Sequence, residues 1–442
     1  MFFKEFPLPK DPVFPELSVN IRDYGAKEGE KATEAIKCAI EAVANAGGGK
    51  VVVPAGNWLV GQIHLKSNIN LHFEEGARVT FSKDPEDYLP IVFTVYEGIR
   101  CYNYSPLIYA NEVENIAITG RGVLDGNGES WWMWAKNLTA RDILYSGELP
   151  VDERRFGTPE YGLRPMFLQI LSSKNVLIEG ITLNNSPCWT VHPVWCEDII
   201  VRGVTIENPT VSPNTDGINI ESCNRALVED CTVVTTGDDM YCLKAGRNED
   251  AWEVGIPCEN VVFRNCRALG PSTSGGIVVG SEMSASVRNV LAEDCYFANN
   301  YNCIRIKSKD GRSGVVENID YKNIKMDKGM RGINISYRYS CEACDDAKEP
   351  GKYMPTVRNI YCENIVCDSV DSGISFDNLP GGVIENIYLK DIKMTAKKCM
   401  SGDSVYNLNM ENVTLIEDPE AGQEPEKVEG VRIFRAPEYK KA

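Results

Sequence analysis

The sequence reads Asn214-Thr215-Asp216-Gly217-Ile218-Asn219-Ile220 and, further on, Thr235-Thr236-Gly237-Asp238-Asp239-Met240-Tyr241-Cys242-Leu243-Lys244-Ala245-Gly246. Asp216 and Asp238 are 22 residues apart, and each stands beside a glycine and ahead of an alternating apolar run, which is typical of a loop leading into a strand. If such a span makes one turn of a coiled sheet, the carboxylates stack on strands about 4.8 Å apart. Carboxylates brought together in this way suit cleavage of a glycosidic bond by one acid and one base.

A structural alternative applies to each of these acidic positions taken alone. Asp-Gly and Gly-Asp pairs are common turn sequences, and a turn needs no further function. The adjacent acids Asp238 and Asp239 are harder to explain in this way, because they repel each other unless they are solvated or used. Together the three residues are therefore candidates for a catalytic cluster.

One sequence phrase recurs along most of the chain: Asn or Asp followed by apolar residues in alternation. It is found at Asn115-Ile-Ala-Ile118, Asn175-Val-Leu-Ile178, Asp198-Ile-Ile-Val201, Ala226-Leu-Val228, Asn260-Val-Val-Phe263, Asn289-Val-Leu291, Asn318-Ile319, Asn359-Ile360, Asn386-Ile387 and Asn412-Val413. From Asn175 onward the starts fall mostly 23 to 35 residues apart, with one gap of 41. Such spacing indicates a parallel β-solenoid, in which each coil buries its apolar faces against its neighbours.

The repeated asparagine favours a ladder of side chains at the turn, where stacked amides hydrogen-bond from coil to coil. A β-sandwich is the alternative, but it predicts turn signals about every 8 to 12 residues and no repeated phrase. We therefore expect an all-β fold, a parallel β-helix.

The N-terminal region has a different pattern. Residues 19–26 alternate like a strand, and Thr33 then opens a short amphipathic helix that Gly47-Gly48-Gly49 ends. Its predicted apolar face consists of Ala35, Ile36, Ala39, Ile40 and Val43. Such a helix could cover the open end of the sheet. We expect residues 1–60 to form a lead and cap that is continuous with a β-helix over 61–442, as one domain.

Charge excludes several classes of partner. With 46 basic and 63 acidic residues the net charge is −17, and no Lys/Arg-rich run offsets it, so nucleic acid and anionic membrane surfaces are not expected partners. No segment is apolar for long enough to cross a bilayer, and the N-terminus has no signal-peptide core. The expected location is cytoplasmic, or extracellular if a signal peptide has been removed. The sequence leaves the oligomeric state open.

The cysteines and histidines give no metal motif. Sixteen scattered cysteines fit buried free thiols in a reducing compartment, and Cys341-Glu-Ala-Cys344, the one CxxC pair, is interpreted as a loop. None of the three histidines has metal-ligand spacing. We expect no metal and no cofactor.

Aromatic residues gather in a long interval between repeats. Trp131, Trp132, Trp134, Tyr145, Phe156 and Tyr161 lie among charges between Gly128 and Arg164. Such rings can pack on the wall of the solenoid or form a platform for sugar rings, and the sequence does not decide between these roles.

Several motifs together resemble the polygalacturonases of glycoside hydrolase family twenty-eight, nearest to the bacterial exo-acting members. They are Asp23-Tyr-Gly25-Ala26, Ser186-Pro187-Cys-Trp189, Asn214-Thr-Asp216, Gly237-Asp238-Asp239, Gly275-Gly-Ile-Val-Val-Gly280-Ser281-Glu282 and Arg305-Ile306-Lys307. The resemblance implies a right-handed parallel β-helix and inverting hydrolysis of α-linked galacturonic acid in pectic oligosaccharides. It also implies that Asp238 protonates the leaving oxygen while Asp216 and Asp239 activate water. The aromatic interval could close one end of the substrate site, which favours exo-action.

One position departs from the family pattern. The family usually has a histidine before the Gly-Gly-Ile-Val run, where this chain has Ser274. A serine cannot tune a neighbouring carboxylate by charge, so the pH optimum, the rate and the substrate class are open at this position.

Arg305 and Lys307 are the candidates for gripping a substrate carboxylate. Two residues apart on a strand, they share one face, while Ile304 and Ile306 point into the core. A salt-bridged surface pair is the structural alternative. Asn214, Ser274, His192 and Tyr337 complete the candidate substrate-binding set.

Two other functions remain open from the sequence. A related hydrolase could act on another pectic sugar, such as rhamnose or a side-chain residue, and a non-catalytic β-helix could only bind glycans. Release of reducing sugar from oligogalacturonate separates these classes.

Overall fold

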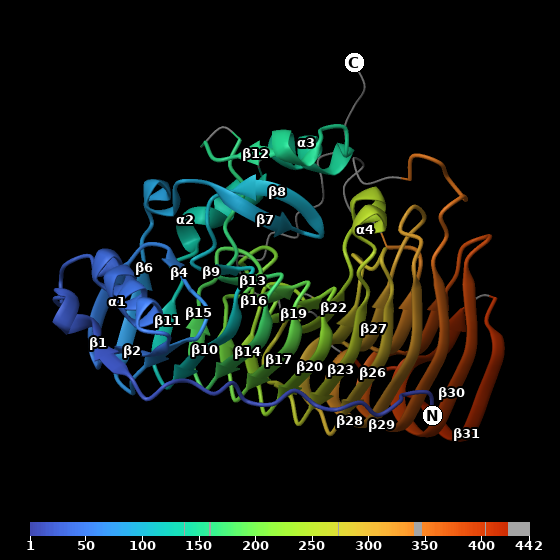
Figure 1. Cartoon of the computed structure of the whole chain (residues 1–442). Coiled ribbons are helices and arrows are strands. Elements are labelled where there is room, and N and C mark those ends of the chain that lie inside the picture. Colours follow the sequence, from blue (N-terminus) through green and yellow to red (C-terminus); the bar gives the residue numbers. More distant parts are fainter. Residues whose placement is uncertain (137, 159–160, 273, 340–346, 403, 423–442) are drawn as a thin grey trace.

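The computed structural model describes the chain except residues 137, 159–160, 273, 340–346, 403 and 423–442. Twenty-eight of the described strands form one long sheet that winds into a right-handed parallel β-helix, and three form a small separate sheet (Figure 1). The predicted fold class is therefore confirmed. Strands from residues 1–60 pair into the same sheet as the later coils.

Each coil contributes strands to three faces. The first face is built by β1 (Ser18–Asn20), β2 (Gly49–Val53), β5 (Ile69–Phe73), β10 (Glu114–Gly120), β14 (Lys174–Glu179), β17 (Glu197–Arg202), β20 (Asn224–Glu229), β23 (Cys258–Arg264) and β26 (Val287–Glu293). The second is built by β3 (Gly56–Val60), β6 (Ala77–Phe81), β11 (Val123–Asp125), β15 (Thr182–Asn184), β18 (Thr205–Glu207), β21 (Thr232–Thr235) and β24 (Arg267–Ala268). The third is built by β4 (Ile63–His64), β9 (Ile108–Asn111), β13 (Leu168–Leu171), β16 (Val191–Val194), β19 (Ile218–Glu221), β22 (Tyr241–Lys244) and β25 (Gly275–Val279).

In the last coils the strands run on through the corners. These long strands are β27 (Tyr296–Lys307), β28 (Val315–Ser336), β29 (Thr356–Asp377), β30 (Val383–Gly402) and β31 (Tyr406–Glu417). The third face carries the candidate site, because the loops holding the three acids lead into β19 and β22.

The N-terminal helix α1 (Thr33–Asn45) begins at the predicted residue and buries the five predicted apolar side chains. It packs against β1, β2, β4 and β5 at the first coil. The strand expected over residues 19–26 is wrong beyond Asn20. There the chain enters the 3-10 helix η1 (Ile21–Tyr24), because the Asn20 side chain accepts a hydrogen bond from the Arg22 amide at 2.9 Å and caps the turn.

Short elements project from the solenoid on one side (Figure 1). They include the antiparallel hairpin of β7 (Val92–Tyr96) and β8 (Ile99–Asn103), to which β12 (Arg155–Phe156) pairs. The helices α2 (Glu129–Trp132) and α3 (Leu138–Ser146), with the 3-10 helices η2 (Pro85–Tyr88), η3 (Met133–Lys136) and η4 (Val151–Glu153), belong to the same region. Helix α4 (Asn248–Val254) projects farther along, after β22. We call the hairpin of residues 92–103 together with residues 129–156 the insertion.

The recurring asparagines form the predicted ladder. Asn359 donates to Asn318 at 2.9 Å and accepts from Asn386 at 3.1 Å, and Asn175 donates to Asn115 at 2.9 Å. These residues have positive φ, the left-handed conformation that Asn tolerates best among residues with a Cβ. The same conformation explains why the phrase begins with Asn or Asp.

Within the described residues, no helix has both the length and the apolar character needed to cross a membrane. The described cysteines are free, and most are buried. The predicted loop at Cys341 and Cys344 lies outside the described residues.

Candidate active site

The three acids lie on adjacent coils because two loops stack in register. The Gly217 amide donates to the Asp239 carbonyl at 2.9 Å, which joins the loop before β19 to the loop before β22. A Cβ at Gly217 would lie 2.4 Å from the Met240 carbonyl oxygen, so only glycine permits this approach. Carboxylate oxygens of Asp216 and Asp239 therefore lie within 4.8 Å of each other.

Asp239 is held by three donors. Its Oδ1 accepts hydrogen bonds from the Ser274 hydroxyl and, at 3.1 Å, from the Gly275 amide, and its Oδ2 accepts from Lys307 Nζ at 2.7 Å. Asp238 is less enclosed: it is half-buried, and its Oδ1 accepts from the Asp239 amide at 2.9 Å. Asp239 is thus fixed in place, whereas Asp238 keeps an accessible side.

The surroundings shift the pKa values of the acids in opposite directions. Burial, and then the charge of Asp239, raise the pKa of Asp238 above its usual range. Burial, and then the charge of Asp238, raise the pKa of Asp216. Burial alone would also raise the pKa of Asp239, but the charges of Lys307, Lys244 and Arg305 outweigh it and lower this pKa. The cluster therefore contains an acid that retains its proton and a neighbour that loses it readily.

The structure brings Arg305 and Lys307 to the cluster, as expected, but gives them different surroundings. Ile304 and Ile306 are buried in the core, so the predicted alternation is confirmed. Lys307 is buried and pairs with Asp239, so it stabilises a catalytic carboxylate rather than offering a free charge to a substrate. Arg305 is half-buried, with Nη1 3.5 Å from Ser274 Oγ.

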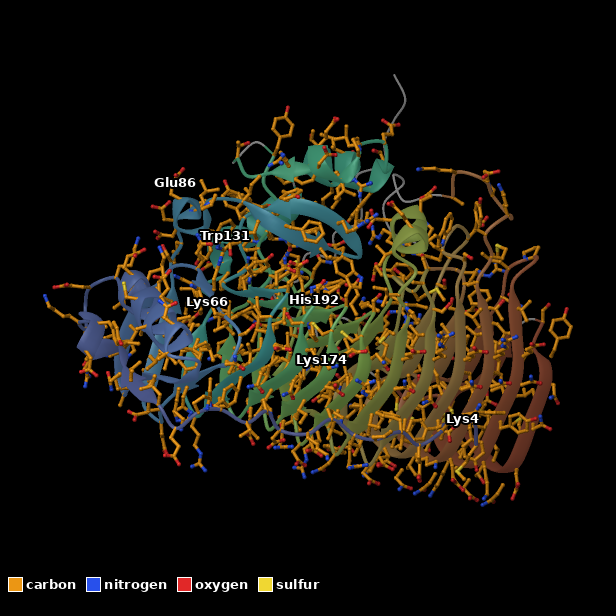
Figure 2. The ribbon with its side chains drawn as sticks, in the orientation of Figure 1. Lys4, Lys66, Glu86, Trp131, Lys174 and His192 are labelled. Carbon is orange, nitrogen blue, oxygen red and sulfur yellow. The ribbon has the colours of Figure 1, made fainter. Side chains whose placement is uncertain are left out.

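His192 and Tyr337 do not offer free groups to a substrate. His192 is fully buried and lies between Gln169 at 2.9 Å and Glu221 at 2.7 Å, so both ring nitrogens are occupied. Figure 2 shows it on the side of the solenoid that faces the β7–β8 hairpin. Tyr337 was predicted wrongly, because its ring belongs to the hydrophobic core and its hydroxyl donates to the Val383 carbonyl at 2.6 Å.

Tyr339, which was not among the predicted residues, lies near the cluster. Its ring lies 5.1 Å from Lys307 Nζ and 5.8 Å from the Arg305 guanidinium carbon. Arg305 was placed by the alternation of β27, whereas Tyr339 lies beyond the end of β28 at Ser336, where strand alternation no longer applies. The sequence signal for Tyr339 was therefore weak.

Asn214 lies at the edge of the site, two residues before Asp216. Its φ is 52°, and its side-chain oxygen accepts from Arg164 Nη2 at 2.7 Å. Arg164 is fully buried, contacts the Pro187 carbonyl at 3.2 Å, and fixes this loop. Sequence reasoning missed Arg164 because it lies at the end of the aromatic interval, far from the acids in sequence.

Lys244 and Glu282 are two further charged residues that the sequence reasoning did not select. Lys244 Nζ lies 3.8 Å from Asp216 Oδ2 and 2.9 Å from Glu282 Oε2. Both stand in stretches quoted above, Lys244 at the end of the strand after the paired acids and Glu282 in the Gly-Ser-Glu run. The available signal was their position on the strand that follows the acids, for Lys244, and just after the next strand of the same face, for Glu282.

A metal ion would have to compete with existing partners in the cluster. Ligand-type atoms of Asp216, Asp239 and Cys242 lie within 4.8 Å of one another. Both Asp239 oxygens already accept hydrogen bonds, and burial raises the pKa of the Cys242 thiol well above its usual range. A protonated thiol and a lysine-paired carboxylate are poor ligands, so we assign no metal ligand here.

Three of the six aromatic residues named in the interval are buried, namely Trp131, Tyr145 and Phe156. Trp131 is buried and its ring meets those of Tyr88, Tyr104 and Trp134. Tyr145 and Phe156 are also buried, whereas Tyr161 is 49% exposed. Trp131 therefore packs in the core of the solenoid, whereas Tyr145 and Phe156 pack in a separate apolar cluster with Tyr96 of the hairpin. Tyr161 is a candidate platform for a sugar.

Comparisons with known proteins agree with this fold and identify the family. Residues 154–415 match the family described as "Glycosyl hydrolases family 28". A probable polygalacturonase from Vitis vinifera is 31% identical over 78% of this chain and 67% of its own length. The crystal structure of a hyperthermoactive exopolygalacturonase from Thermotoga maritima is 36% identical, covers 92% of this chain and 94% of that chain, and superposes with a TM-score of 0.85.

A family 28 exopolygalacturonase from Yersinia enterocolitica shares the fold at 21% identity, with a TM-score of 0.68 over 89% of this chain and 78% of that chain. The family match and the polygalacturonase relatives place this right-handed β-helix in the class of glycosidases. The chain belongs to the glycosyl hydrolases of family 28.

Proposed function

We propose that this protein removes galacturonic acid from the ends of pectic oligosaccharides by inverting hydrolysis. The observation that carries the proposal is the cluster of Asp216, Asp238 and Asp239, in which the pKa of Asp238 is raised and that of Asp239 is lowered. An inverting glycosidase needs one carboxylic acid and one carboxylate at the same site.

The reaction can be written with these groups alone. Asp238 gives its proton to the leaving glycosidic oxygen as the bond from that oxygen to C1 breaks. A water molecule, held by Asp239 and Asp216, bonds to C1 from the opposite face, and its proton passes to the ionised Asp239. Proton exchange with solvent then restores both residues.

Arg305 supports a uronate substrate. Its guanidinium lies beside the cluster and can bind a carboxylate with two parallel hydrogen bonds. Lys307 and Lys244 are committed to the acids of the protein, as their contacts show. Arg305 is therefore the residue to which we assign recognition of the substrate carboxylate.

Two observations support exo-action. The insertion projects beside the third face near its N-terminal coils, where it could limit the number of sugar units on one side of the acids (Figure 1). In addition, the Thermotoga maritima relative with a TM-score of 0.85 is named an exopolygalacturonase.

The test is a time course on oligogalacturonates of defined length. We expect one sugar unit to be lost at a time, and proton NMR of the first product to show inverted anomeric configuration. Release of internal fragments would contradict exo-action, and an unsaturated product would indicate a lyase. Activity on rhamnose-containing pectic oligomers but not on oligogalacturonate would move the substrate to another pectic sugar, and binding without turnover would indicate a glycan-binding solenoid.

A further inference from the structure

A chain of buried charges leads from the catalytic cluster to the insertion. Lys244 Nζ donates to Glu282 Oε2 at 2.9 Å, and Glu282 Oε1 accepts from Arg247 Nη2 at 2.8 Å. Arg247 Nη2 also lies 3.5 Å from Glu97 Oε2, at the turn of the β7–β8 hairpin. All four side chains are at most 7% exposed. Unlike exposed ion pairs, such buried pairs act strongly on neighbouring ionisable groups.

Lys244 is held away from Asp216 by its other partners. Its ammonium donates to the Gly280 carbonyl at 2.8 Å as well as to Glu282, and it lies 4.8 Å from the centre of the Trp189 ring. Its distance to Asp216 Oδ2, 3.8 Å, is that of an ion pair without a hydrogen bond. Glu282 and Gly280 thus take the hydrogen bonds that Asp216 would otherwise receive.

We propose that Glu282 is a positioning residue. It anchors the Lys244 ammonium at 3.8 Å from Asp216 Oδ2 and thereby sets the strength of the electrostatic interaction between Lys244 and that carboxylate. The proposal rests on the function proposed above, since it concerns the same reaction. Among the described residues, the Glu282 side chain accepts hydrogen bonds from Lys244, Arg247 and Ser281, so it acts on Asp216 through Lys244.

The pKa directions agree with this geometry. Burial would raise the pKa of Glu282, but the charges of Lys244, Arg247 and Arg312 hold it well below its usual range, so Glu282 is a permanent anion. Burial would lower the pKa of Lys244, but Glu282 first, followed by Cys242, Asp216 and Asp239, keeps it well above its usual range. Lys244 is therefore a permanent cation. Further charged groups near this pair are Asp238 and Lys307, on which the charge of Lys244 acts, Glu97 beside Arg247, and Glu221, which is in register with Lys244 and pairs with His192.

The proposal predicts opposite effects for the two members of the pair. Removing the anion in Glu282→Gln leaves Lys244 free to bond Asp216, which stabilises the ionised cluster, so both limbs of the pH profile of kcat/KM should move to lower pH by about one unit. Removing the cation in Lys244→Met should move both limbs to higher pH by a similar amount. The double variant should return toward the wild-type profile, because the two charges are removed together.

The matched control is Glu253→Gln. Glu253 also pairs with an arginine, Arg100 at 2.7 Å, but it is 73% exposed, so solvent screens its charge and its loss should leave the profile unchanged. Glu282→Asp, which keeps the charge but shortens its reach, should shift the profile less than Glu282→Gln. It also serves as the folded variant if Glu282→Gln does not fold.

Shifts in the same direction for Glu282→Gln and Lys244→Met, or lower rates with an unchanged profile, would overturn the proposal. The substrate-free readout is a carbon NMR titration of the Asp216 carboxyl, assigned by comparison with Asp216→Asn. There Glu282→Gln should lower, and Lys244→Met raise, the titration midpoint. If the wild type does not hydrolyse oligogalacturonate, the proposed function fails while this titration still decides the role of Glu282.

Discussion

At the scale of single residues, Asp238 and Asp239 are neighbours in sequence with opposite surroundings. Asp239 is fully buried and accepts hydrogen bonds from Ser274, Gly275 and Lys307, whereas Asp238 is half-buried and accepts one from the Asp239 amide. A cation lowers the pKa of a carboxyl, and burial beside an anion raises it. One loop therefore supplies both an ionised carboxylate and a proton donor.

The variant Asp238→Asn should fold normally and lose at least about two decades of kcat, because a general acid typically contributes 10² to 10⁴ in rate. The measurement is steady-state hydrolysis of oligogalacturonate. Asp152→Asn, an exposed acid of the insertion, is the control and should retain full activity. If Asp238→Asn keeps more than a tenth of wild-type turnover, Asp238 is not the proton donor.

The variant Lys307→Met should shift the acid limb of the pH profile of kcat/KM to higher pH. The charge of Lys307 is the largest influence that lowers the pKa of Asp239, so removing it raises that pKa, and a higher pH is then needed to ionise the base. An unchanged acid limb would show that the ionisation of Asp239 does not limit the reaction at low pH.

The variant Arg305→Ala should weaken binding of galacturonate oligomers by roughly 1.5 to 3 kcal/mol, the range for a hydrogen bond to a charged group. Binding to the inactive Asp238→Asn background, measured by calorimetry across a salt series, should also lose salt sensitivity. Equal affinity with and without Arg305 at every salt concentration would favour a neutral sugar.

Much of the site at this scale could be predicted from sequence, and the failures have a physical reason. The spacing of Asp216 and Asp238, one coil apart, was enough to bring them together, and strand alternation placed Arg305 and Ile304 on opposite sides. Alternation says which face a side chain is on but not what lies opposite. It therefore could not show that Lys307 forms an ion pair with Asp239, or that the Tyr337 side chain packs in the core after β28 ends.

At the scale of elements, the asparagine ladders decide where each coil turns. The predicted ladder is joined by a second one, in which Asn265 donates to Asp230 at 2.6 Å, Asn364 to Asn323 at 2.9 Å and Asn412 to Asp391 at 2.5 Å. The sequence phrase placed Asn412 with the first ladder, whereas Asn407 occupies that column and donates to Asn386 at 2.7 Å. Two adjacent turns share the same residue preference, so sequence alone could not separate them.

The variant Asn359→Ala should destabilise the protein by roughly 1 to 3 kcal/mol, because it removes two ladder hydrogen bonds and places alanine at φ 57°. Asn359→Gly is the matched variant, since glycine adopts this conformation freely and only the hydrogen bonds are lost. The midpoint of urea unfolding should fall further for Ala than for Gly. If both variants unfold at the wild-type midpoint, the ladder does not stabilise the coils.

At the scale of the whole molecule, residues 1–17 run as an extended arm along the outside of the solenoid, from its last strands to its first coil (Figure 1). Lys4 is labelled in Figure 2. Its backbone amide donates to Asn289 Oδ1 at 2.7 Å, and its backbone carbonyl accepts from Asn289 Nδ2 at 3.0 Å. Phe3 and Phe6 pack on an outward apolar column of Leu227, Val262 and Leu291. The arm thus joins coils that are far apart in the stack, which a solenoid with contacts only between neighbouring coils does not otherwise do.

The variant Phe3→Ala/Phe6→Ala should therefore lower thermal stability without changing kcat/KM. The two rings are half-buried, so their loss should cost about 1 to 3 kcal/mol together, less than two fully buried rings would. Activity should persist because the arm lies against first-face strands, whereas the acids lead into strands of the third face. Calorimetry and oligogalacturonate kinetics on the same preparation measure both properties, with Val13→Ala, 82% exposed on the same arm, as the control. A loss of kcat/KM in the double variant at unchanged melting temperature would show instead that the arm acts on the site rather than on the stability of the stack.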